Sequence, residues 1–301
     1  MKYIEQLLRK KDNKNSWHYL PFSLFFFGIM FLNALLIKYS EVSTNDAIKM
    51  SIEKYGKNIN FLINILPMAV LLVFLLGWVR IFHQQSILSL TTARSQVDWK
   101  RVLHGFCIWS VITLVFIGIA IISSPKDYEL TFNASAFFPF LFIALLLIPL
   151  QTSFEEFLMR GYLMQGIGLA TKSRAVALCT TSIIFGLMHL ANPEVEQLGY
   201  GIMIFYIGMG FFFGIMTLMD DGIELALGFH AANNIIGALL LTSNWTAFQT
   251  NSIFLDVSEQ PTISYLETFI QIGIVLPLVL FYLGKKYKWN NWTGRLFGRI
   301  K

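Results

Sequence analysis

Eight long apolar runs constrain the fold of this chain more than any other feature of its sequence. A helix that crosses a bilayer needs roughly 17–25 mostly apolar residues, and each run is about that long. The chain is 55% hydrophobic and only 14% charged, which is the composition of a membrane protein. We therefore expect an all-α, polytopic integral membrane protein with about eight transmembrane helices. The runs lie at about residues 20–37, 61–82, 102–123, 136–154, 174–191, 199–219, 223–242 and 263–284.

Lysine and arginine residues are divided unevenly between the two sides that these runs define. Eight crossings place both termini on one side, where seventeen basic residues fall, against five on the other side. Because cytoplasmic loops carry an excess of lysine and arginine, we expect cytoplasmic termini in a bacterial inner membrane. The net charge of +5 then reflects loop orientation and indicates no nucleic-acid partner. Residues 1–14 combine apolar and basic side chains, which favours a short amphipathic helix on anionic membrane lipid.

Residues 154–161, Phe-Glu-Glu-Phe-Leu-Met-Arg-Gly, place three charges in an otherwise lipid-soluble stretch. A charge at the centre of a bilayer costs roughly 2.5–3.5 kcal/mol on insertion scales, so charged residues there are candidates for function. On a helix, Glu156 and Arg160 are four residues apart and are expected to pair on one face. Glu155 lies about 100° around the helix from Glu156 and is expected to have no local partner. The alternative is that the cluster only ends a helix at the membrane surface.

Two of the chain's five histidines lie inside apolar runs close to other polar residues. His189 ends the fifth run, and His230 and Asn234 in the seventh run are four residues apart, so one helical face presents both. Glu155 and His189 are equally far from the predicted turn between the fourth and fifth runs, so an antiparallel hairpin brings them to one level. His230 lies about 12 Å from the next predicted turn, and it reaches the same depth if the first turn projects about 13 Å further into the cytoplasm. We therefore expect these side chains to line a polar cavity below the cytoplasmic surface.

This set of side chains suits the hydrolysis of an amide bond. Glu155 beside His189 can take a proton from water and pass it on, which is general acid–base chemistry. The ring of His230 and the amide of Asn234 are donors suited to a developing oxyanion. The sequence contains no Gly-x-Ser-x-Gly nucleophile motif and no His-Glu-x-x-His zinc helix. Glu155, His189 and His230 can instead ligate zinc with an open fourth position, and spacing alone does not separate the two versions.

Three motifs resemble those of the CAAX-protease and bacteriocin-processing family, also called Abi. This family of intramembrane endopeptidases includes the type II CAAX prenyl endopeptidases. The resemblance covers roughly residues 136–242, about a third of the chain, and the expected helix count is also similar to that of the family. The motifs are Glu155-Glu156-x-x-x-Arg160, Phe185-x-x-x-His189 and His230-x-x-x-Asn234.

The resemblance implies a role for each of these side chains. Glu155 and His189 would activate water, and His230 with Asn234 would stabilise the oxyanion. The family is often described as metal-dependent, while a metal-free mechanism based on glutamate is also proposed for it. We favour the metal-free version, with no cofactor, because an asparagine suits an oxyanion hole better than it suits zinc. A divalent metal such as zinc is the alternative, with Glu155, His189 and His230 as its ligands.

The same resemblance divides the chain into three parts. Residues 136–242 correspond to a catalytic core, whose first helix runs on to about residue 169. Within it, Glu156 and Arg160 would be supporting groups that position the site. Residues 1–135 add the amphipathic N-terminal segment and three transmembrane helices. Residues 243–301 add an outer loop, the last transmembrane helix and a basic C-terminal tail.

The sequence therefore predicts an intramembrane endopeptidase whose substrate is a membrane-associated protein or peptide. Nothing in it favours prenylated CAAX substrates, the family's eukaryotic case, over bacteriocin maturation, self-immunity or regulated processing, and it favours no oligomeric state. The main alternative is a membrane transporter or receptor subunit that uses the same residues to relay protons or bind a ligand. Transporters often show inverted repeats, which this chain lacks. A catalytically inactive scaffold is a third alternative, which the complete motif set disfavours.

Overall fold

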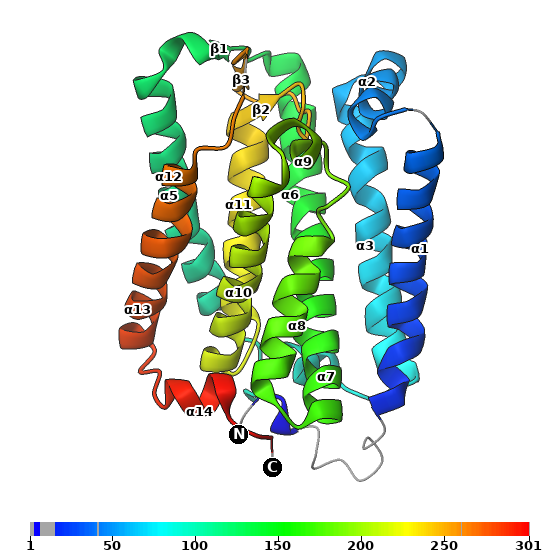
Figure 1. The fold of residues 1–301 in the computed structure, drawn as a ribbon, viewed down its shortest axis with the longest axis vertical. Helices are drawn as coiled ribbons and strands as arrows, with labels where there is room; N and C mark the ends of the chain where they lie inside the picture. Colours follow the sequence, from blue (N-terminus) through cyan, green and yellow to red (C-terminus); the bar gives the residue numbers. More distant parts are fainter. Residues whose placement is uncertain (1–2, 7–15, 41, 260, 301) are drawn as a thin grey trace.

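The computed structural model describes residues 3–6, 16–40, 42–259 and 261–300. Its helices run side by side along one axis, and short connecting elements close both ends of the bundle (Figure 1). Within the described residues, strands are limited to three short segments. The all-α class predicted from the sequence is confirmed.

Six helices in the described part of the chain are long and apolar enough to cross a membrane, which confirms a polytopic membrane protein. The longest is a rod of 38 residues built from α6 (Ala134–Glu156), a π-helical segment (Phe157–Leu163) and α7 (Met164–Thr171). As predicted, this rod continues well past the acidic pair. The six spans are Trp17–Tyr39, Lys57–Ile81, Trp99–Ser123, Ala134–Thr171, Tyr200–Asp220 and Tyr265–Lys286.

Two of the eight predicted spans form shorter helices inside the bundle. α8 (Arg174–Leu187) has 14 residues and ends in turns at residues 188–192, so His189 lies beyond the helix that was expected to contain it. α11 (Glu224–Leu240) has 17 residues and passes directly into strand β2 (Leu241–Ser243). Irregular backbone is tolerated at membrane depth where it is buried in protein or lines a cavity. Both helix ends meet that condition, because both contribute to the cavity described below.

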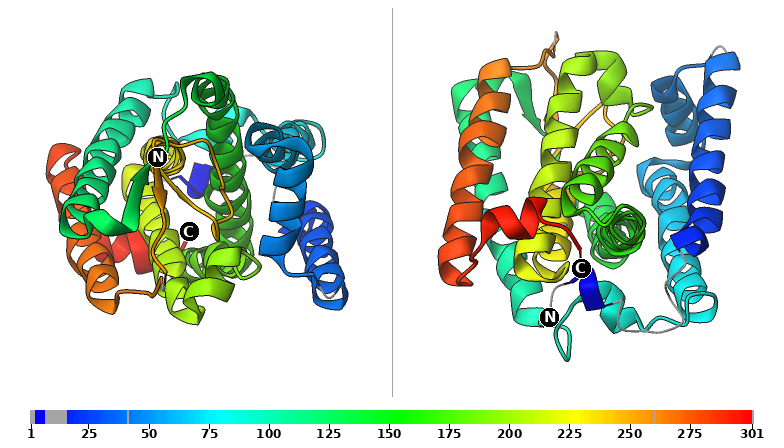
Figure 2. Two further views of the ribbon diagram at one scale, coloured as in Figure 1. Left: turned by 90° about the horizontal axis from the view of Figure 1, so that it is seen from above. Right: turned by 60° about the horizontal axis from the view of Figure 1, so that its bottom comes forward.

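The remaining helices flank these central elements and close the ends of the bundle. They are α1 (Leu20–Tyr39), α2 (Thr44–Tyr55), α3 (Lys57–Ile81), α4 (Ile87–Thr91), α5 (Trp99–Ser123), α9 (Pro193–Leu198), α10 (Met203–Asp220), α12 (Tyr265–Phe269), α13 (Leu276–Lys286) and α14 (Trp292–Phe297). A second π-helical segment, Ile270–Val275, joins α12 to α13. Figure 2 shows α1 to α3 together at one flank of the bundle.

α11 packs against α5, α6 and α10, and α8 packs against α10. Two glycines permit the closest of these approaches. A Cβ atom at Gly228 on α11 would lie 1.9 Å from the carbonyl oxygen of Val102 on α5. A Cβ atom at Gly210 on α10 would lie 2.4 Å from the carbonyl oxygen of Ser182 on α8. Larger residues at either position would force the helices apart, as is usual for small residues at contacts between membrane helices.

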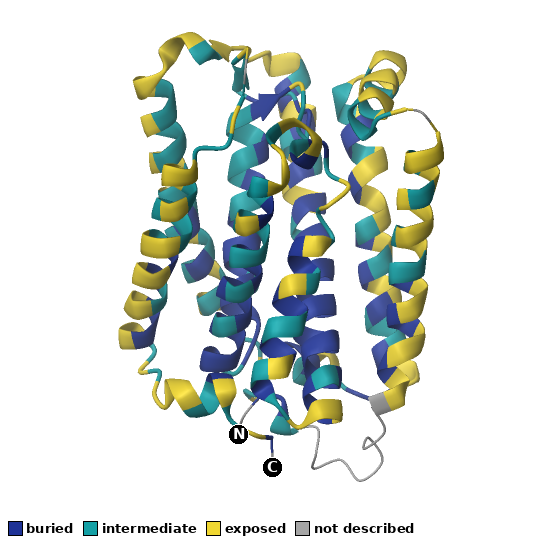
Figure 3. Ribbon diagram, in the orientation of Figure 1, coloured by how far each residue is buried: buried dark blue, intermediate teal, exposed yellow. Residues whose placement is uncertain are grey.

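Burial separates the inner faces of the helices from the outer ones. Figure 3 shows buried residues gathered on the central helices and exposed residues on the outward sides of α1, α3 and α13. The exposed residues include large apolar side chains such as Phe31, Val73 and Phe281. An apolar outer surface of this kind is expected of helices that face lipid, because lipid tails are as apolar as the side chains.

The two ends of the bundle hold different elements of the chain. We call the end that holds Tyr3 and Ile300, the first and last described residues, the terminal end (Figure 1). The opposite, far end holds α2, α9 and a small sheet. In this sheet, β3 (Phe254–Asp256) pairs antiparallel with β1 (Tyr128–Leu130) and parallel with β2. Both termini therefore lie at one end, as an even number of crossings requires, and the cytoplasmic location of that end stays a prediction.

The beginning of the chain departs from the expected helix on lipid. Tyr3 and Ile4 are 1% and 2% exposed, because their side chains pack into the protein core. The hydroxyl of Tyr3 donates a hydrogen bond to the carbonyl oxygen of Leu90. Residues 1–2 and 7–14 of the expected amphipathic segment lie outside the described residues. The described part therefore docks on protein rather than on lipid.

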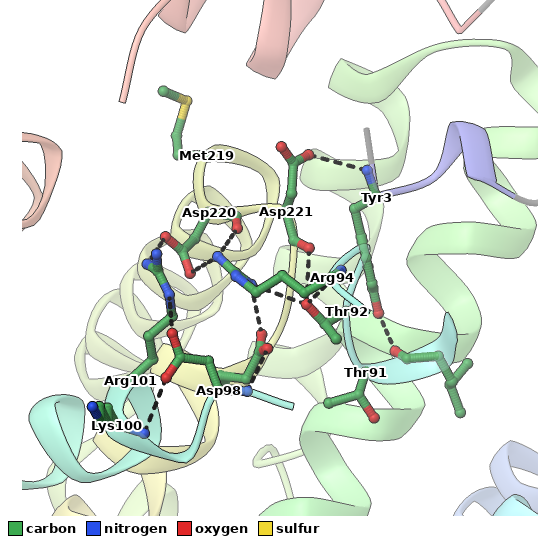
Figure 4. A network of polar contacts seen from close by, with 12 residues as sticks. Tyr3, Thr91, Thr92, Arg94, Asp98, Lys100, Arg101, Met219, Asp220 and Asp221 are labelled. Carbon is green, nitrogen blue, oxygen red and sulfur yellow. Dashed lines mark hydrogen bonds and ion pairs between the residues drawn. The ribbon is translucent and has the colours of Figure 1, made fainter. Parts of the chain in front are cut away.

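Charged side chains tie several segments together at the terminal end, and we call this group the end network (Figure 4). Arg94 binds Asp220 at 2.9 Å and Glu224 at 3.1 Å, and Arg101 binds Asp98 at 3.0 Å and Asp220 at 2.5 Å. These ion pairs join the segment before α5, α5 itself, the end of α10 and the start of α11. The full end network comprises Arg94, Asp98, Arg101, Asp220, Asp221, Glu224 and Arg295.

Candidate active site

The four predicted catalytic residues line one cavity of about 430 Å³. Glu155 comes from α6, His189 from the turn after α8, and His230 and Asn234 from α11. Side chains of α3, α10 and the segment after β2 complete the wall. The structure thus brings together the side chains that the two predicted turns placed at one level.

Glu155 is 6% exposed, and its two carboxylate oxygens have different surroundings. Oε1 accepts a hydrogen bond from the amide of Gln151, one helical turn earlier. The expectation that Glu155 has no local partner is therefore wrong, because a residue at i−4 lies on the same helical face. Oε2 has no hydrogen-bond partner among the described residues, and Nε2 of His230 lies 3.7 Å from it. This oxygen is thus buried in the cavity wall without a hydrogen bond.

Glu156 and Arg160 form the ion pair predicted from their spacing, at 2.9 Å and with both side chains fully buried. Arg160 lies on the π-helical segment that follows Glu156, and such segments often occur at functional sites. Its Nη2 donates to the carbonyl oxygen of Gly210 at 3.1 Å. Its guanidinium carbon lies 4.3 Å from the ring centre of Phe185. These additional contacts offset part of the cost of removing two charges from water.

His230 lies between the two glutamates. Its Nδ1 is 2.7 Å from Oε1 of Glu156, and its Nε2 is the nitrogen nearer Glu155. The imidazole ring also stacks on Phe213, with the ring centres 5.1 Å apart and the planes at 22°. Glu156 therefore links Arg160 to His230 and holds the imidazole in one orientation. We call Glu155, Glu156, Arg160, His189 and His230 the cavity cluster.

His189 is held by contacts on two sides. Its Nδ1 lies 2.9 Å from the carbonyl oxygen of Phe185 and donates to it, because a carbonyl can only accept. In the neutral ring, Nε2 then carries the lone pair. The ring stacks on Tyr206 of α10, with the centres 4.3 Å apart and the planes at 17°. The turn after α8 thus presents an oriented imidazole to the cavity.

A row of amide side chains connects α11 to Glu155. Trp109 donates to Asn233 at 3.0 Å, and Asn233 donates to Asn234 at 3.0 Å. Asn234 donates to Gln151 at 3.1 Å, and Gln151 donates to Glu155. Reasoning from the sequence missed Gln151, although a polar residue four positions before Glu155 in an apolar run was a usable signal. Because an asparagine amide has two N–H donors, one N–H of Asn234 stays available to a ligand.

The cavity occupies the far half of the bundle. Its lining reaches α9 through Glu194, and it reaches the segment after β2 through Phe248. Toward the terminal end, Glu156 and Arg160 are fully buried below Glu155. The prediction placed the cavity below the surface of the terminal end. This is wrong, because the cavity extends toward the far end instead. The depth argument fixed the level of the side chains and not the end to which the space between them opens.

The donor atoms of the cavity cluster do not form a metal-binding set. Among the described residues, no three His, Cys, Asp or Glu side chains are grouped so that they could hold a metal ion. The Nδ1 atoms of His189 and His230 face a carbonyl and a carboxylate, an arrangement that is usual for zinc-binding histidines. The positions of the side chains, and not these hydrogen bonds, therefore disfavour zinc. The zinc version, with Glu155, His189 and His230 as ligands, would need these side chains to move.

The fold and the cavity define a polytopic membrane protein with a buried cluster of glutamate, histidine and asparagine. A family model described as type II CAAX prenyl endopeptidase Rce1-like matches residues 133–236, a segment that contains all six predicted site residues. This match confirms the family resemblance for that segment. The chain is also 33% identical over 165 residues to the uncharacterized protein YyaK of Bacillus subtilis (strain 168). That match covers 54% of this chain and 55% of the relative, so the chain spans about half the length of that protein. No solved structure matches the chain.

Proposed function

We propose that the chain is an intramembrane endopeptidase that hydrolyses a peptide bond of a membrane-associated protein or peptide. The observation that carries the proposal is the buried Oε2 of Glu155, which has no hydrogen-bond partner among the described residues and faces Nε2 of His230 at 3.7 Å. An unpaired carboxylate in a cavity is a candidate base because few groups there compete for its lone pairs. The match to the CAAX endopeptidase family supports the same activity.

The cavity wall suits a peptide better than a lipid tail or a small ion. Five amide side chains line the cavity, and a peptide main chain inside a membrane needs donors and acceptors of this kind to replace water. Aromatic and methionine side chains form much of the remaining wall and would receive apolar substrate side chains. The five amides are those of Asn64, Gln151, Asn192, Asn233 and Asn234.

In the proposed reaction, Glu155 and His189 activate a water molecule. Oε2 of Glu155 takes a proton from the water, and the water oxygen attacks the carbonyl carbon of the scissile bond. The lone pair of Nε2 in His189 accepts the second hydrogen of that water and orients it. When the carbon–nitrogen bond breaks, Glu155 returns its proton to the leaving amine. This exchange of one proton is ordinary general acid–base catalysis.

His230 and Asn234 would stabilise the negative charge that develops on the carbonyl oxygen. The free N–H of Asn234 is one donor. In its imidazolium form, His230 donates from Nδ1 to Glu156 and presents Nε2–H as the second donor. Glu156 and Arg160 act through His230, because they hold its ring and balance its charge. Donors fixed before the reaction are more effective than donors that must reorient.

Detection of new N-termini tests this proposal whatever the sequence of the substrate. Membranes from cells that produce the wild-type chain are compared with membranes that contain Glu155→Gln, and the N-termini of membrane proteins are labelled and sequenced by mass spectrometry. We expect cleavage products that are present only with the wild type. Identical N-termini in both samples would exclude a proteolytic role for Glu155. The exposed Glu196, exchanged for glutamine, is the matched control and should leave the products unchanged.

We further propose that the chain lies in a bacterial inner membrane, in contact with lipid and with cytoplasmic termini. The cavity would then open toward the outside, because its lining reaches the end opposite the termini. Reporter fusions at each terminus test the orientation. A signal typical of the cytoplasm is expected from both fusions, and an extracytoplasmic signal from either would reverse the side on which substrates enter.

A further inference from the structure

Glu194 stands out among the cavity residues that the proposed mechanism does not use. It lies in the first turn of α9, at the far end of the cavity. Its Oε1 accepts a hydrogen bond from the backbone N–H of Ala247 at 2.9 Å, which ties α9 to the segment after β2. Its Oε2 is buried and has no hydrogen-bond partner among the described residues. Oε1 thus connects two segments of the fold, whereas Oε2 makes no hydrogen bond among the described residues.

The carboxylates of the cavity wall favour a positively charged occupant. Its lining includes two carboxylates, Glu155 and Glu194, and among the described lining residues there is no lysine or arginine. The structural bond to Ala247 does not need a charge, because a glutamine carbonyl would accept it equally well. A buried carboxylate without a cationic partner is costly. A ligand that supplies the missing donor would remove that cost.

We propose that Glu194 forms a subsite for a positively charged group, an ammonium or guanidinium, that a peptide substrate carries into the far end of the cavity. The subsite rests on the peptidase proposal and adds to it a preference for basic peptides. Glu194 lies at the far end and Glu155 deeper in the cavity, so the subsite would act on selection of the peptide and leave the chemical step to Glu155. A charge-assisted hydrogen bond to Oε2 would supply the selectivity.

A binding experiment with paired peptides tests the subsite separately from catalysis. The full chain carries Glu155→Gln, which prevents turnover and leaves Glu194 as the one carboxylate among the described lining residues. The probe is a short apolar peptide, fluorescently labelled and N-acetylated, with lysine at one position. Its partner has norleucine there, which keeps the length of the side chain and removes the charge. A third peptide, with norleucine and a free N-terminus, distinguishes a basic side chain from a terminal amine as the source of the charge.

We expect the lysine peptide, or the peptide with the free N-terminus, to bind about tenfold more tightly than the neutral one. This ratio should fall to about one in Glu194→Gln. It should be unchanged in Glu196→Gln, which alters an exposed acid of the same helix. Equal affinity of all three peptides for the chain with Glu194 intact would overturn the subsite, whether or not the variants fold. A preference that survives Glu194→Gln would also overturn it.

The pH dependence of the preference provides a second readout. Burial raises the pKa of the Glu194 carboxyl above its ordinary value. The carboxylate binds a cation only when it is ionised, so the preference should be present above this raised pKa and disappear as the pH falls through it. The loss should therefore begin at a higher pH than for an ordinary glutamate. A preference that does not change across the acidic range would contradict the assignment to Glu194.

Discussion

The end network and the cavity cluster are both groups of charged side chains, but their carboxylates have different surroundings. In the end network only Asp220 and Glu224 are buried. In the end network, each of the eight oxygens of its four carboxylates accepts a hydrogen bond. In the cavity cluster, Glu155 and Glu156 each keep one oxygen without a hydrogen-bond partner among the described residues. The two groups lie in one bundle and share a helix, because α11 carries Glu224 at its start and His230 further along.

The comparison teaches how to distinguish structural from functional charge in this chain. A buried carboxylate with both oxygens hydrogen-bonded contributes to a fixed arrangement of segments, and its loss should destabilise the fold. A buried carboxylate with an unused oxygen adds little to that arrangement and is costly to keep. Its retention is explained most simply by a ligand that the oxygen meets during function.

The largest effect is expected from Glu155→Gln, which tests the functional side of the comparison. Glutamine can still accept the hydrogen bond from Gln151 but cannot take a proton from water. Turnover should fall by a factor of about 10²–10⁴. The free energy of unfolding should stay the same or rise, because a buried charge has been removed. Both quantities can be measured on purified protein, as product formation in proteoliposomes and as resistance to denaturant in detergent.

Glu224→Gln is the matched control from the end network, because Glu224 is equally buried and also lies in the bundle. It should show the reverse pattern, with a loss of about 1–3 kcal/mol of stability and unchanged turnover per folded molecule. Suppose that Glu155→Gln and Glu224→Gln lose turnover equally and keep normal stability. A carboxylate oxygen without a hydrogen-bond partner would then not distinguish a functional residue from a structural one in this chain.

The pair of Glu156 and Arg160 is expected to have the next largest effect. It sharpens the comparison because Glu156 is ion-paired, like the carboxylates of the end network, yet keeps one oxygen without a hydrogen bond, like Glu155. Glu156→Gln or Arg160→Met should each destabilise the protein by roughly 3–5 kcal/mol, since each leaves a buried charge without its partner. The double variant should recover part of the loss. Folded yield and denaturation of the four proteins measure this coupling. Single variants with normal stability and no turnover would instead move the pair into the chemistry.

Asn234→Ala is expected to reduce the rate without unfolding the protein. It removes one proposed oxyanion donor, which typically costs a factor of about 10²–10³ in rate. It also leaves the carbonyl oxygen of Gln151 without its donor, so a small loss of stability should accompany the change. Turnover and unfolding measured on the same preparation separate the two effects. A rate within a factor of about three of the wild type would remove Asn234 from the oxyanion site.

Treatment with a chelator is expected to have the smallest effect. If Glu155 acts as a base without a metal, protein exposed to a strong chelator should keep its turnover, and elemental analysis should find no stoichiometric zinc. A loss of activity that one equivalent of zinc restores would reassign Glu155, His189 and His230 as ligands. The identity of the site residues would be the same in either case, and only their roles would change.

Much of the fold could be predicted because membrane helices are long and apolar. Run lengths located the six full spans, and helical spacing predicted the pair of Glu156 and Arg160. The same method overestimated α8 and α11, because a count of apolar residues does not detect where the backbone leaves the helix. The turns at 188–192 and strand β2 are stabilised by contacts with distant segments, such as the pairing of β2 with β3. Such contacts leave no mark on local hydropathy.

The candidate site was predictable to a similar extent. The equal spacing of Glu155 and His189 from one turn predicted that they meet, since a helix has a fixed rise per residue. His230 joined them only on the assumption that this turn projects about 13 Å further than the next one. The direction in which the cavity opens depends on how side chains from several elements fill the terminal half, and spacing contains no information on that. Gln151 and Glu194 were missed for a related reason. Each has a partner far away in the sequence, Asn234 or Ala247, although the spacing of Gln151 from Glu155 was a local signal.

The closing contacts of the terminal end also set an order of events during biosynthesis. The backbone N–H of Tyr3 bonds to Asp221, Glu5 pairs with Arg174, and Arg295 pairs with the same Asp221. Tyr3 and Glu5 therefore meet their partners Asp221 and Arg174 only after the middle of the chain is made. The ion pair of Arg295 with Asp221 forms later still, after residue 295 has left the ribosome. A chain that stops before residue 295 would lack this contact at the terminal end.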